Sequence, residues 1–183
     1  LYKEEKTWIR LAKNGQALVQ DKYGDAANRA SLLKVLDQAQ ALPVSLLNDY
    51  CQSADPVAVP NPGVEVDVDV SIIVPVYNKW HLTRACLTSV VQTSVGSGVT
   101  YEVILADDGS TDETVHAAHV FPGLRVVKTP RNLGFQRNCN NAAKQARGRH
   151  ILLLNNDTVV LPGWLESLYR TMEQDPSIAI VGS

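Results

Sequence analysis

The chain has 183 residues, of which 45% are hydrophobic, and a formal net charge of -2 at pH 7. That length fits one domain, or one domain with an appendage. This charge argues against a nucleic-acid partner, because no basic stripe is present to neutralise phosphates. No apolar run approaches the ~20 residues that a membrane-spanning helix needs. Three widely spaced cysteines without a C-x-x-C pair favour reduced thiols. We therefore expect a cytoplasmic protein, with peripheral attachment at the inner face of a membrane as an alternative.

The chain divides by composition into three regions. Residues 1–53 carry apolar side chains at helical spacing, so we expect a helical preface that joins the domain to a neighbouring domain or protein partner. Residues 54–70 read as a linker that ends in an extended edge segment, because prolines and a glycine are followed by strict alternation from Val64 to Val70. Residues 71–183 form the third region.

In this third region, short aliphatic runs alternate with helical patterns. Strands are predicted at 71–76, 101–106, 124–128 and 150–154, and a fifth is predicted to start at 178–181. Helices are predicted at 81–94, 112–119, 135–147 and from 162–164 to about 174. Ser110 and Glu113 form a predicted capping box, and Gly148 is the predicted C-cap of the third helix. This order predicts an α/β fold with a parallel sheet.

Polar clusters stand where three of these strands end. Tyr77-Asn78 follows the first strand, Asp107-Asp108-Gly109 follows the second, and Asn155-Asn156-Asp157 follows the strand at 150–154. Ligands of open α/β sheets bind outside the carboxyl ends of the strands. The three clusters therefore predict one shared site.

Neither of the common phosphate-cradling loops, G-x-G-x-x-G or G-x-x-x-x-G-K-[ST], is present. The polar motifs instead occur in a characteristic order: residues 71–78 (SIIVPVYN), 107–112 (DDGSTD), 132–134 with 137–138, 148–157 and 162–164. In this order they resemble the nucleotide-sugar-binding half of a GT-A glycosyltransferase of the inverting family 2. The likeness covers residues 71–183, and its LNNDT segment is most similar to bacterial rhamnosyltransferase-type members that build cell-surface polysaccharide.

The resemblance implies transfer of a sugar from a UDP- or dTDP-linked donor to a hydroxyl of a glycan or lipid-linked acceptor. It implies that Asp108 reads the base, as a carboxylate can accept the N3–H of uracil or thymine. A carboxylate can also read guanine, so uridine or thymidine is a preference. Main-chain groups of Pro75, Val76 and Asn78 are expected to face that base. Tyr77 either stacks on the base or is a partly buried core side chain.

The remaining implied contacts concern the diphosphate, the ribose and a metal. Arg137, at a predicted helix start, would contact the diphosphate or the base side of the donor. Asn155 and Asn156 would bind ribose hydroxyls. Asp157 would ligate Mg²⁺ or Mn²⁺, although the family's usual D-x-D has two carboxylates and this chain has one.

In the family the catalytic base comes from the acceptor half, so we expect it beyond Ser183 and expect no catalytic residue in this chain. By that interpretation the chain is a donor-binding fragment that is inactive alone. The alternative is a non-catalytic nucleotide-binding or assembly module. A sugar-nucleotidyltransferase is disfavoured, because residues 77–80 (YNKW) are not the Gly-rich basic loop that it needs after the first strand.

Overall fold

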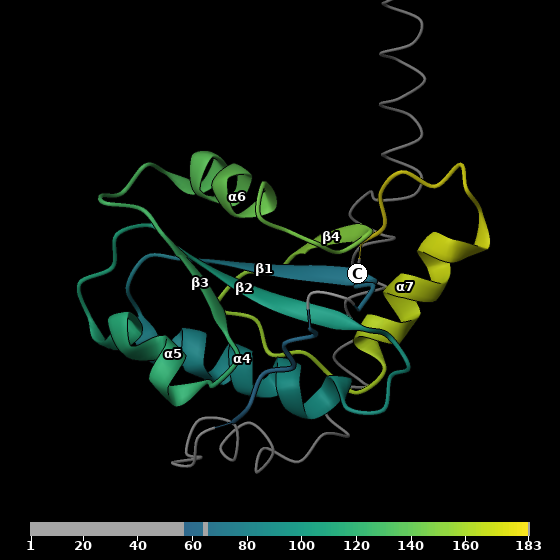
Figure 1. Cartoon of the computed structure of the whole chain (residues 1–183), viewed down its shortest axis with the longest axis horizontal. Helices are drawn as coiled ribbons and strands as arrows, with labels where there is room; N and C mark the ends of the chain where they lie inside the picture. Colours follow the sequence, from purple (N-terminus) through teal and green to yellow (C-terminus); the bar gives the residue numbers. More distant parts are fainter. Residues whose placement is uncertain (1–56, 64–65, 183) are drawn as a thin grey trace, which may run out of the picture. The chain divides into compact units, whose positions relative to one another are not determined.

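The structure is a computed structural model that describes residues 57–63 and 66–182, all within the second of two compact units of the chain, Leu47–Ser183. The predicted helical preface at 1–53 lies outside the described residues. The elements run in the order β1 (Val70–Val76), α4 (Trp80–Ser94), β2 (Tyr101–Asp107), the 3₁₀ helix η1 (Glu113–His116), α5 (Ala117–Val120), β3 (Arg125–Lys128), α6 (Phe135–Ala143), β4 (His150–Leu153) and α7 (Trp164–Gln174) (Figure 1).

The four strands form one parallel sheet in the order β3-β2-β1-β4. Figure 1 shows α6 on one side of this sheet and α4 with α5 on the other. All seven residues of β1 and all seven of β2 are buried, as expected for central parallel strands covered on both faces. The α/β fold with a parallel sheet is thereby confirmed.

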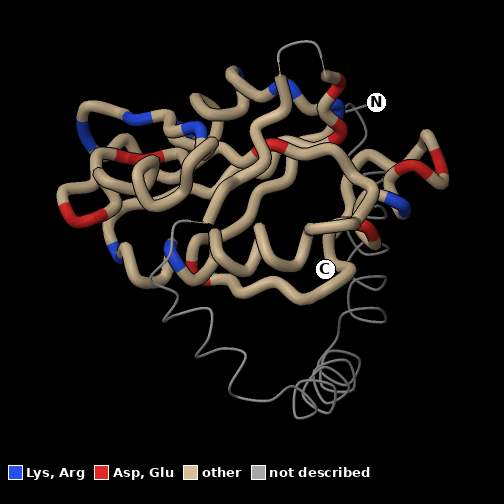
Figure 2. The backbone as a smooth tube through the Cα atoms, turned by 60° about the horizontal axis from the view of Figure 1, so that its bottom comes forward, with Lys and Arg blue, Asp and Glu red and all other residues tan. Residues whose placement is uncertain are grey.

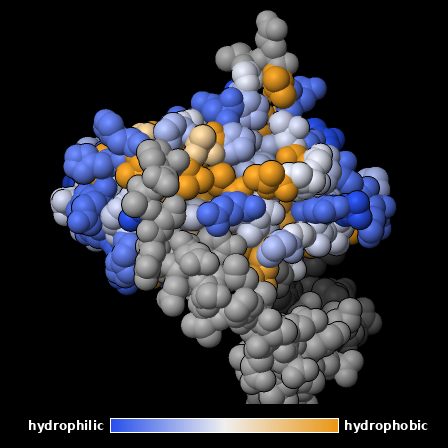
Figure 3. Space-filling view, turned by 90° about the horizontal axis from the view of Figure 1, so that it is seen from below, coloured by the Kyte–Doolittle hydropathy of each residue, from blue (hydrophilic) through white to orange (hydrophobic). Residues whose placement is uncertain are grey.

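Two apolar clusters hold the layers together, one on each face of the sheet. Ile72, Val74 and Leu105 pack with α4 and with Leu165 of α7. On the opposite face, Ile73 and other small or branched residues of the strands pack beneath α6. Alternate residues of each strand point to opposite faces, so a continuous aliphatic run supplies both clusters. Figure 3, which looks onto the side of α4 and α5, shows apolar side chains gathered in a band between hydrophilic ones.

The start of the second predicted helix is corrected by the structure. Ser110 is not its cap, because the Ser110 hydroxyl accepts the Asn78 N–H at 2.8 Å. Asp112 is the N-cap instead, accepting the Thr114 N–H at 3.1 Å. The predicted helix at 112–119 is also divided, into η1 and the single turn of α5. A bond to a distant loop thus replaces the local capping box.

The end of the third predicted helix differs as well. α6 ends at Ala143, four residues before the predicted end, and Gly148 is not its C-cap. The Arg147 N–H donates to the Glu102 carboxylate at 2.8 Å, and the Gly148 N–H donates to the Ser71 hydroxyl at 2.8 Å. These partners lie on β1 and β2, so they draw the chain away from the helix axis before its last predicted turn.

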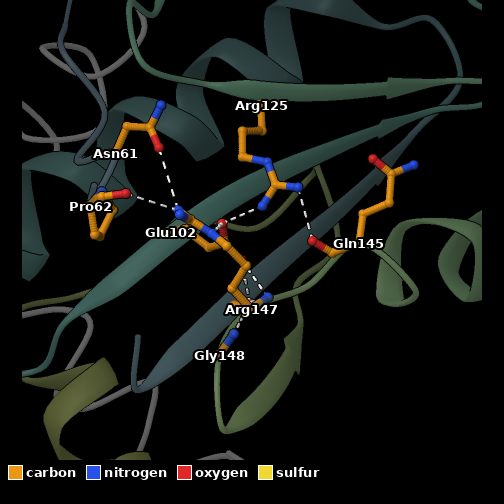
Figure 4. A network of polar contacts seen from close by, with 8 residues as sticks. Asn61, Pro62, Glu102, Arg125, Gln145, Arg147 and Gly148 are labelled. Atoms are coloured by element: carbon orange, nitrogen blue, oxygen red, sulfur yellow. Dashed lines mark hydrogen bonds and ion pairs between the residues drawn. The ribbon is translucent and has the colours of Figure 1, made fainter. Parts of the chain in front are cut away.

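Glu102 is the centre of this anchor at the amino ends of the strands (Figure 4). Its side chain is 1% exposed, and it accepts bonds from the Ser71 hydroxyl, from the Arg125 guanidinium and from the Arg147 side chain. Burial alone would raise the pKa of Glu102, but these hydrogen bonds together hold it below its usual value. The network therefore joins β1, β2, β3 and the α6–β4 loop.

The structure also tests the predicted fifth strand and the expected edge segment before β1. Residues 178–181 form no strand in the structure, and Ile180 is 90% exposed, so the predicted start of a fifth strand is wrong for this region. In the expected edge segment, residues 64–65 lie outside the described residues, and regular strand begins only at Val70. Within the part of the chain that the structure describes, no helix is both long and apolar enough to cross a membrane.

Candidate donor site

The predicted site lies at the carboxyl edge of the sheet, where β1 and β2 end in register. Val76 is opposite Asp107, and Asp107 is opposite Lys128 of β3. β4 stops earlier, because its last residue, Leu153, is paired with Ile73. The chain moves from β1 to β2 and β3 on one side and to β4 on the other, so the topological switch point lies between β1 and β4. This is the position at which α/β sheets bind ligands.

Pro75 lies in the central strand β1, yet its missing N–H removes no hydrogen bond of the sheet. The Leu154 N–H donates to the Ile73 carbonyl at 3.0 Å, so Ile73 directs its main-chain groups toward β4. Successive strand residues direct these groups to alternate neighbours, and Pro75 therefore also faces the side of β4, beyond its end. The proline removes a donor only where no strand would accept it, because β4 ends opposite Ile73.

The turn after β1 combines an exposed aromatic ring with strained backbone. Tyr77 is 51% exposed. Asn78 and Lys79 both have positive φ, at 58° and 60°, a conformation that costs non-glycine residues of order 1–3 kcal/mol each. The Asn78 side-chain oxygen stabilises the turn by accepting the Thr111 N–H at 2.9 Å. Asn78 therefore joins the loops after β1 and β2, and Tyr77 is held at the surface.

Both carboxylates at the end of β2, Asp107 and Asp108, are buried and hydrogen-bonded. Asp107 accepts the Ser110 N–H at 2.7 Å. Asp108 accepts the Thr129 hydroxyl at 2.9 Å and the Leu133 and Gly134 N–H groups at 2.8 Å each. Only one of these bonds, that from Gly134, is made to Asp108 Oδ2, so that oxygen keeps acceptor capacity. Asp108 thus also shapes the loop that leads into α6.

Gly109 is required next to these carboxylates. Its φ is +80°, and an added Cβ would lie 2.9 Å from the main-chain carbon of Arg131. The loops after β2 and β3 therefore touch through their backbones at this edge.

The start of α6 offers a positive surface. Gly134 is its N-cap and makes no side-chain cap, and no acidic residue stands in the first turn. Arg137 is exposed in that turn. Figure 2 shows Lys and Arg segments and Asp and Glu segments interspersed along the described backbone. Free N–H groups, the helix dipole and a guanidinium together suit an anion. Asn138, by contrast, is buried and donates to the Ala106 carbonyl at 2.6 Å, so it anchors α6 to the sheet.

The loop after β4 presents Asn155 and Asp157 to solvent. No hydrogen bond or ion pair joins the Asp157 carboxylate to another of the described residues. Asn156 is half-buried, and its amide nitrogen donates to the Thr83 hydroxyl at 3.0 Å, which leaves its side-chain oxygen as an acceptor. No cluster of three metal-ligating side chains occurs among the residues that the structure covers. This loop therefore offers a single carboxylate, Asp157, as a charged ligand.

Residues 71–183 match the family described as Glycosyl transferase family 2. The chain belongs to this family. The match covers the sheet, its helices and all three polar clusters, and it confirms the resemblance read from the motifs.

Individual family 2 relatives are similar over the same region. An uncharacterized glycosyltransferase of Haemophilus influenzae is 31% identical over 113 residues, which are 61% of this chain and 37% of the relative. The minor teichoic acid biosynthesis protein GgaA of Bacillus subtilis is 32% identical over 106 residues, or 54% of this chain and 24% of GgaA. The chain thus spans well under half the length of these relatives.

Solved structures show the same GT-A fold. TarS of S. aureus, residues 1–349, has a TM-score of 0.51 and 27% identity over 58% of this chain and 33% of its own. The mannosyltransferase PcManGT from Pyrobaculum calidifontis, in complex with GDP-Man and Mn²⁺, has a TM-score of 0.55 over 72% of this chain and 39% of its own. At 23% identity, that second likeness concerns the fold alone.

The sequence motifs of this family 2 chain did not reveal how the third cluster is supported. The periodicity of α4 suggested an apolar face, yet Thr83, Cys86 and Ser89 on that helix are each 0% exposed. Burial and the nearby Asp157 charge raise the pKa of the Cys86 thiol to about 12, so it remains a donor, and its sulfur lies 3.5 Å from the Asn155 carbonyl oxygen. The available signal was the spacing of three small polar residues along one helix row.

Proposed function

We propose that this chain binds the nucleoside diphosphate sugar of an inverting glycosyltransferase that acts in glycan or polysaccharide synthesis. The donor is a UDP- or dTDP-linked hexose, and the acceptor is a hydroxyl of a glycan or lipid-linked molecule. The observation that carries the proposal is that three polar clusters follow the carboxyl ends of β1, β2 and β4, on either side of the switch point, with an exposed arginine at the start of α6. We propose a cytoplasmic location, with peripheral membrane attachment as the alternative.

The pyrimidine is assigned to the turn after β1. Tyr77 is exposed and held by a strained, hydrogen-bonded turn, so its ring can stack on a base at little conformational cost. Main-chain groups of Pro75, which lies beyond the end of β4, would meet the base edge, whereas the Val76 carbonyl already accepts the Asp108 N–H at 2.9 Å. The free acceptor capacity of Asp108 Oδ2 suits the N3–H of uracil or thymine.

The ribose and the diphosphate are assigned to the loop after β4 and the start of α6. The side-chain oxygens of Asn155 and Asn156 can accept hydrogen bonds from ribose hydroxyls. Arg137 and the first N–H groups of α6 would hold the diphosphate and offset the charge that develops as it leaves.

The exposed Asp157 carboxylate fits a Mg²⁺ or Mn²⁺ ion, provided that phosphate oxygens and water complete the coordination shell. Such an ion would neutralise charge on the departing diphosphate. Because this loop supplies one carboxylate, we expect metal affinity to depend strongly on bound nucleotide.

The proton of the acceptor hydroxyl needs a base, and we assign none among the described residues. Asp107 and Asp108 are buried and already hold neighbouring loops through hydrogen bonds. The match covers 33% of TarS residues 1–349 and 39% of PcManGT. We propose that the base and the acceptor pocket come from the part of the enzyme that this chain does not span, and that the chain binds donor without turning it over.

The test is calorimetric titration of UDP, dTDP and GDP into the 183-residue chain, with and without Mn²⁺. We expect a pyrimidine diphosphate to bind, more tightly with Mn²⁺, and Tyr77→Ala to weaken it about tenfold, as the loss of one stacked ring does. Val95→Ala is the control, because Val95 is 78% exposed at the far end of α4. Absence of binding by all three nucleotides, with the protein folded, would refute the proposal.

A further inference from the structure

One row of α4 carries small polar side chains into the interior. Thr83, Cys86 and Ser89 are spaced three residues apart, and each is 0% exposed. Within an apolar helix face, such groups need hydrogen-bond partners, since an unpaired buried polar group costs about 1–3 kcal/mol. The partners identify what this row does.

Each of the three residues contacts the loop that follows β4. The Thr83 hydroxyl accepts from the Asn156 amide at 3.0 Å. The Cys86 thiol donates to the Asn155 carbonyl at 3.5 Å. The Ser89 hydroxyl donates to the carbonyl of Cys86 at 2.7 Å and accepts the Val160 N–H at 3.1 Å. The loop is thus attached to one helix on both sides of Asp157.

These attachments are the main polar support of that segment. Residues 154–163 form neither helix nor strand, and their own main-chain bonds include one turn, from the Thr158 N–H to the Asn155 carbonyl. Leu154 still donates to Ile73, so the segment is continuous with the sheet on one side. Without the α4 row, the chain from Asn155 to Val160 would rely on that turn and on apolar contacts.

We propose that Thr83, Cys86 and Ser89 are positioning residues that hold the Asn155–Asp157 loop in the orientation required for metal-assisted donor binding. This inference rests on the proposed function. None of the three side chains reaches solvent, so they act through Asn155, Asn156 and Val160 and do not contact the donor. Removing a residue that orients a metal-binding residue without touching the metal typically changes metal affinity about 10–100-fold.

Thr83 is the most informative member of the row. Thr83→Val keeps the shape of the side chain and removes only the hydroxyl. The Asn156 amide that loses its partner is half-buried and can bind water, so the fold is little affected. Thr83→Ser restores the hydroxyl. Thr93→Val is the matched control, because the Thr93 hydroxyl donates only to the Ser89 carbonyl within α4.

The experiment compares the dissociation constant of UDP with and without Mn²⁺ for the 183-residue chain and these variants. In Thr83→Val we expect the gain in affinity that Mn²⁺ confers to fall about tenfold, in addition to any weakening of metal-free binding through the ribose contact assigned to Asn156. Thr83→Ser and Thr93→Val should retain the wild-type gain. An unchanged gain from Mn²⁺ in Thr83→Val, whether or not UDP binding weakens overall, would overturn the proposal.

Amide hydrogen exchange supplies a reading that needs no nucleotide. Ser89→Ala removes the acceptor of the Val160 N–H, so exchange at Val160 should accelerate while exchange in β1 stays unchanged. Unchanged exchange at Val160 would overturn the positioning role even if the wild type binds UDP. Faster exchange in a chain that binds no nucleotide would refute the proposed function and reduce the row to support of a loop.

Discussion

Replacing Glu102 by glutamine removes the charge from the most fully bonded carboxylate at the amino edge of the sheet. Glu102 is 1% exposed, and two guanidinium groups contact it: Arg125 Nη1, and Arg147 Nε at 3.0 Å. The glutamine would keep the size of the side chain but place an amide N–H₂ among donors. Removing one partner of a buried ion pair costs about 3–5 kcal/mol.

The arginines reduce that cost. Their side chains are 29% and 31% exposed, so water can solvate part of the released charge. We therefore expect Glu102→Gln to lower the free energy of unfolding by about 3 kcal/mol, at the lower end of the range. Urea unfolding followed by tryptophan fluorescence at about pH 7 measures this difference. Glu166→Gln is the control: its pair with Arg170 is an exposed contact of adjacent helix turns, worth about 0.3–0.5 kcal/mol.

The pH dependence provides a second reading. The folded-state pKa of Glu102 is held below its usual 4.5, so its contribution is complete above that value and is lost as the pH falls through the lowered pKa. The difference between wild type and Glu102→Gln should therefore shrink in acid. A loss no larger than that of Glu166→Gln, or a difference that persists unchanged in acid, would refute the reasoning. UDP affinity should not change, because Ser71, beside Glu102, is five residues or roughly 16 Å from the carboxyl end of β1.

Three further predictions concern single sites. Gly148→Ala should lower the free energy of unfolding by about 2–3 kcal/mol in the same urea assay, because its Cβ would collide with the Ser71 nitrogen, whereas Gly63→Ala, with nothing within 4 Å, should not. The pKa of the Cys86 thiol rises from 9.0 to about 12 on folding, so its contribution to stability is lost as the pH rises above 9. Between about pH 9 and pH 11 the free energy of unfolding of wild type should therefore fall by about 2 kcal/mol more than that of Cys86→Ala. Equal falls in the two proteins would contradict this. Asp157→Asn should abolish the effect of Mn²⁺ on UDP titration while leaving the melting temperature unchanged, since the carboxylate is exposed; a retained Mn²⁺ effect would place the metal elsewhere.

The strands and the edge at which polar residues collect were predictable from local pattern. β1 and β2 are aliphatic on both faces, which only a central parallel strand requires, and the observed strands begin and end within one residue of the predicted bounds. The polar residues after them were placed at one edge by the rule that parallel strands end together. The roles assigned to those residues in donor binding stay predictions.

The errors arose where a distant group replaced a local one. Ser110 carries the signature of a helix cap, but its hydroxyl is taken by Asn78, 32 positions away. Residues that favour helix continue beyond Ala143, where α6 ends, but the Arg147 N–H donates to the Glu102 carboxylate on β2. A local sequence pattern reflects the structure that a segment favours by itself. It does not include the hydrogen bonds that the segment makes to distant residues once the chain has folded.

The sequence by itself determined the fold class, the family and the edge at which polar groups collect, because these depend on hydrophobic periodicity and on motifs that are contiguous in the chain. Only the tertiary structure decided which polar side chains remain available there. Asp108, Asn78 and Asn156 all stand at the predicted edge, yet each makes hydrogen bonds to another loop or helix, while Tyr77 and Asp157 are exposed. The physical reason is that a buried polar group must find a partner, and the choice of partner depends on which segments the sheet brings together.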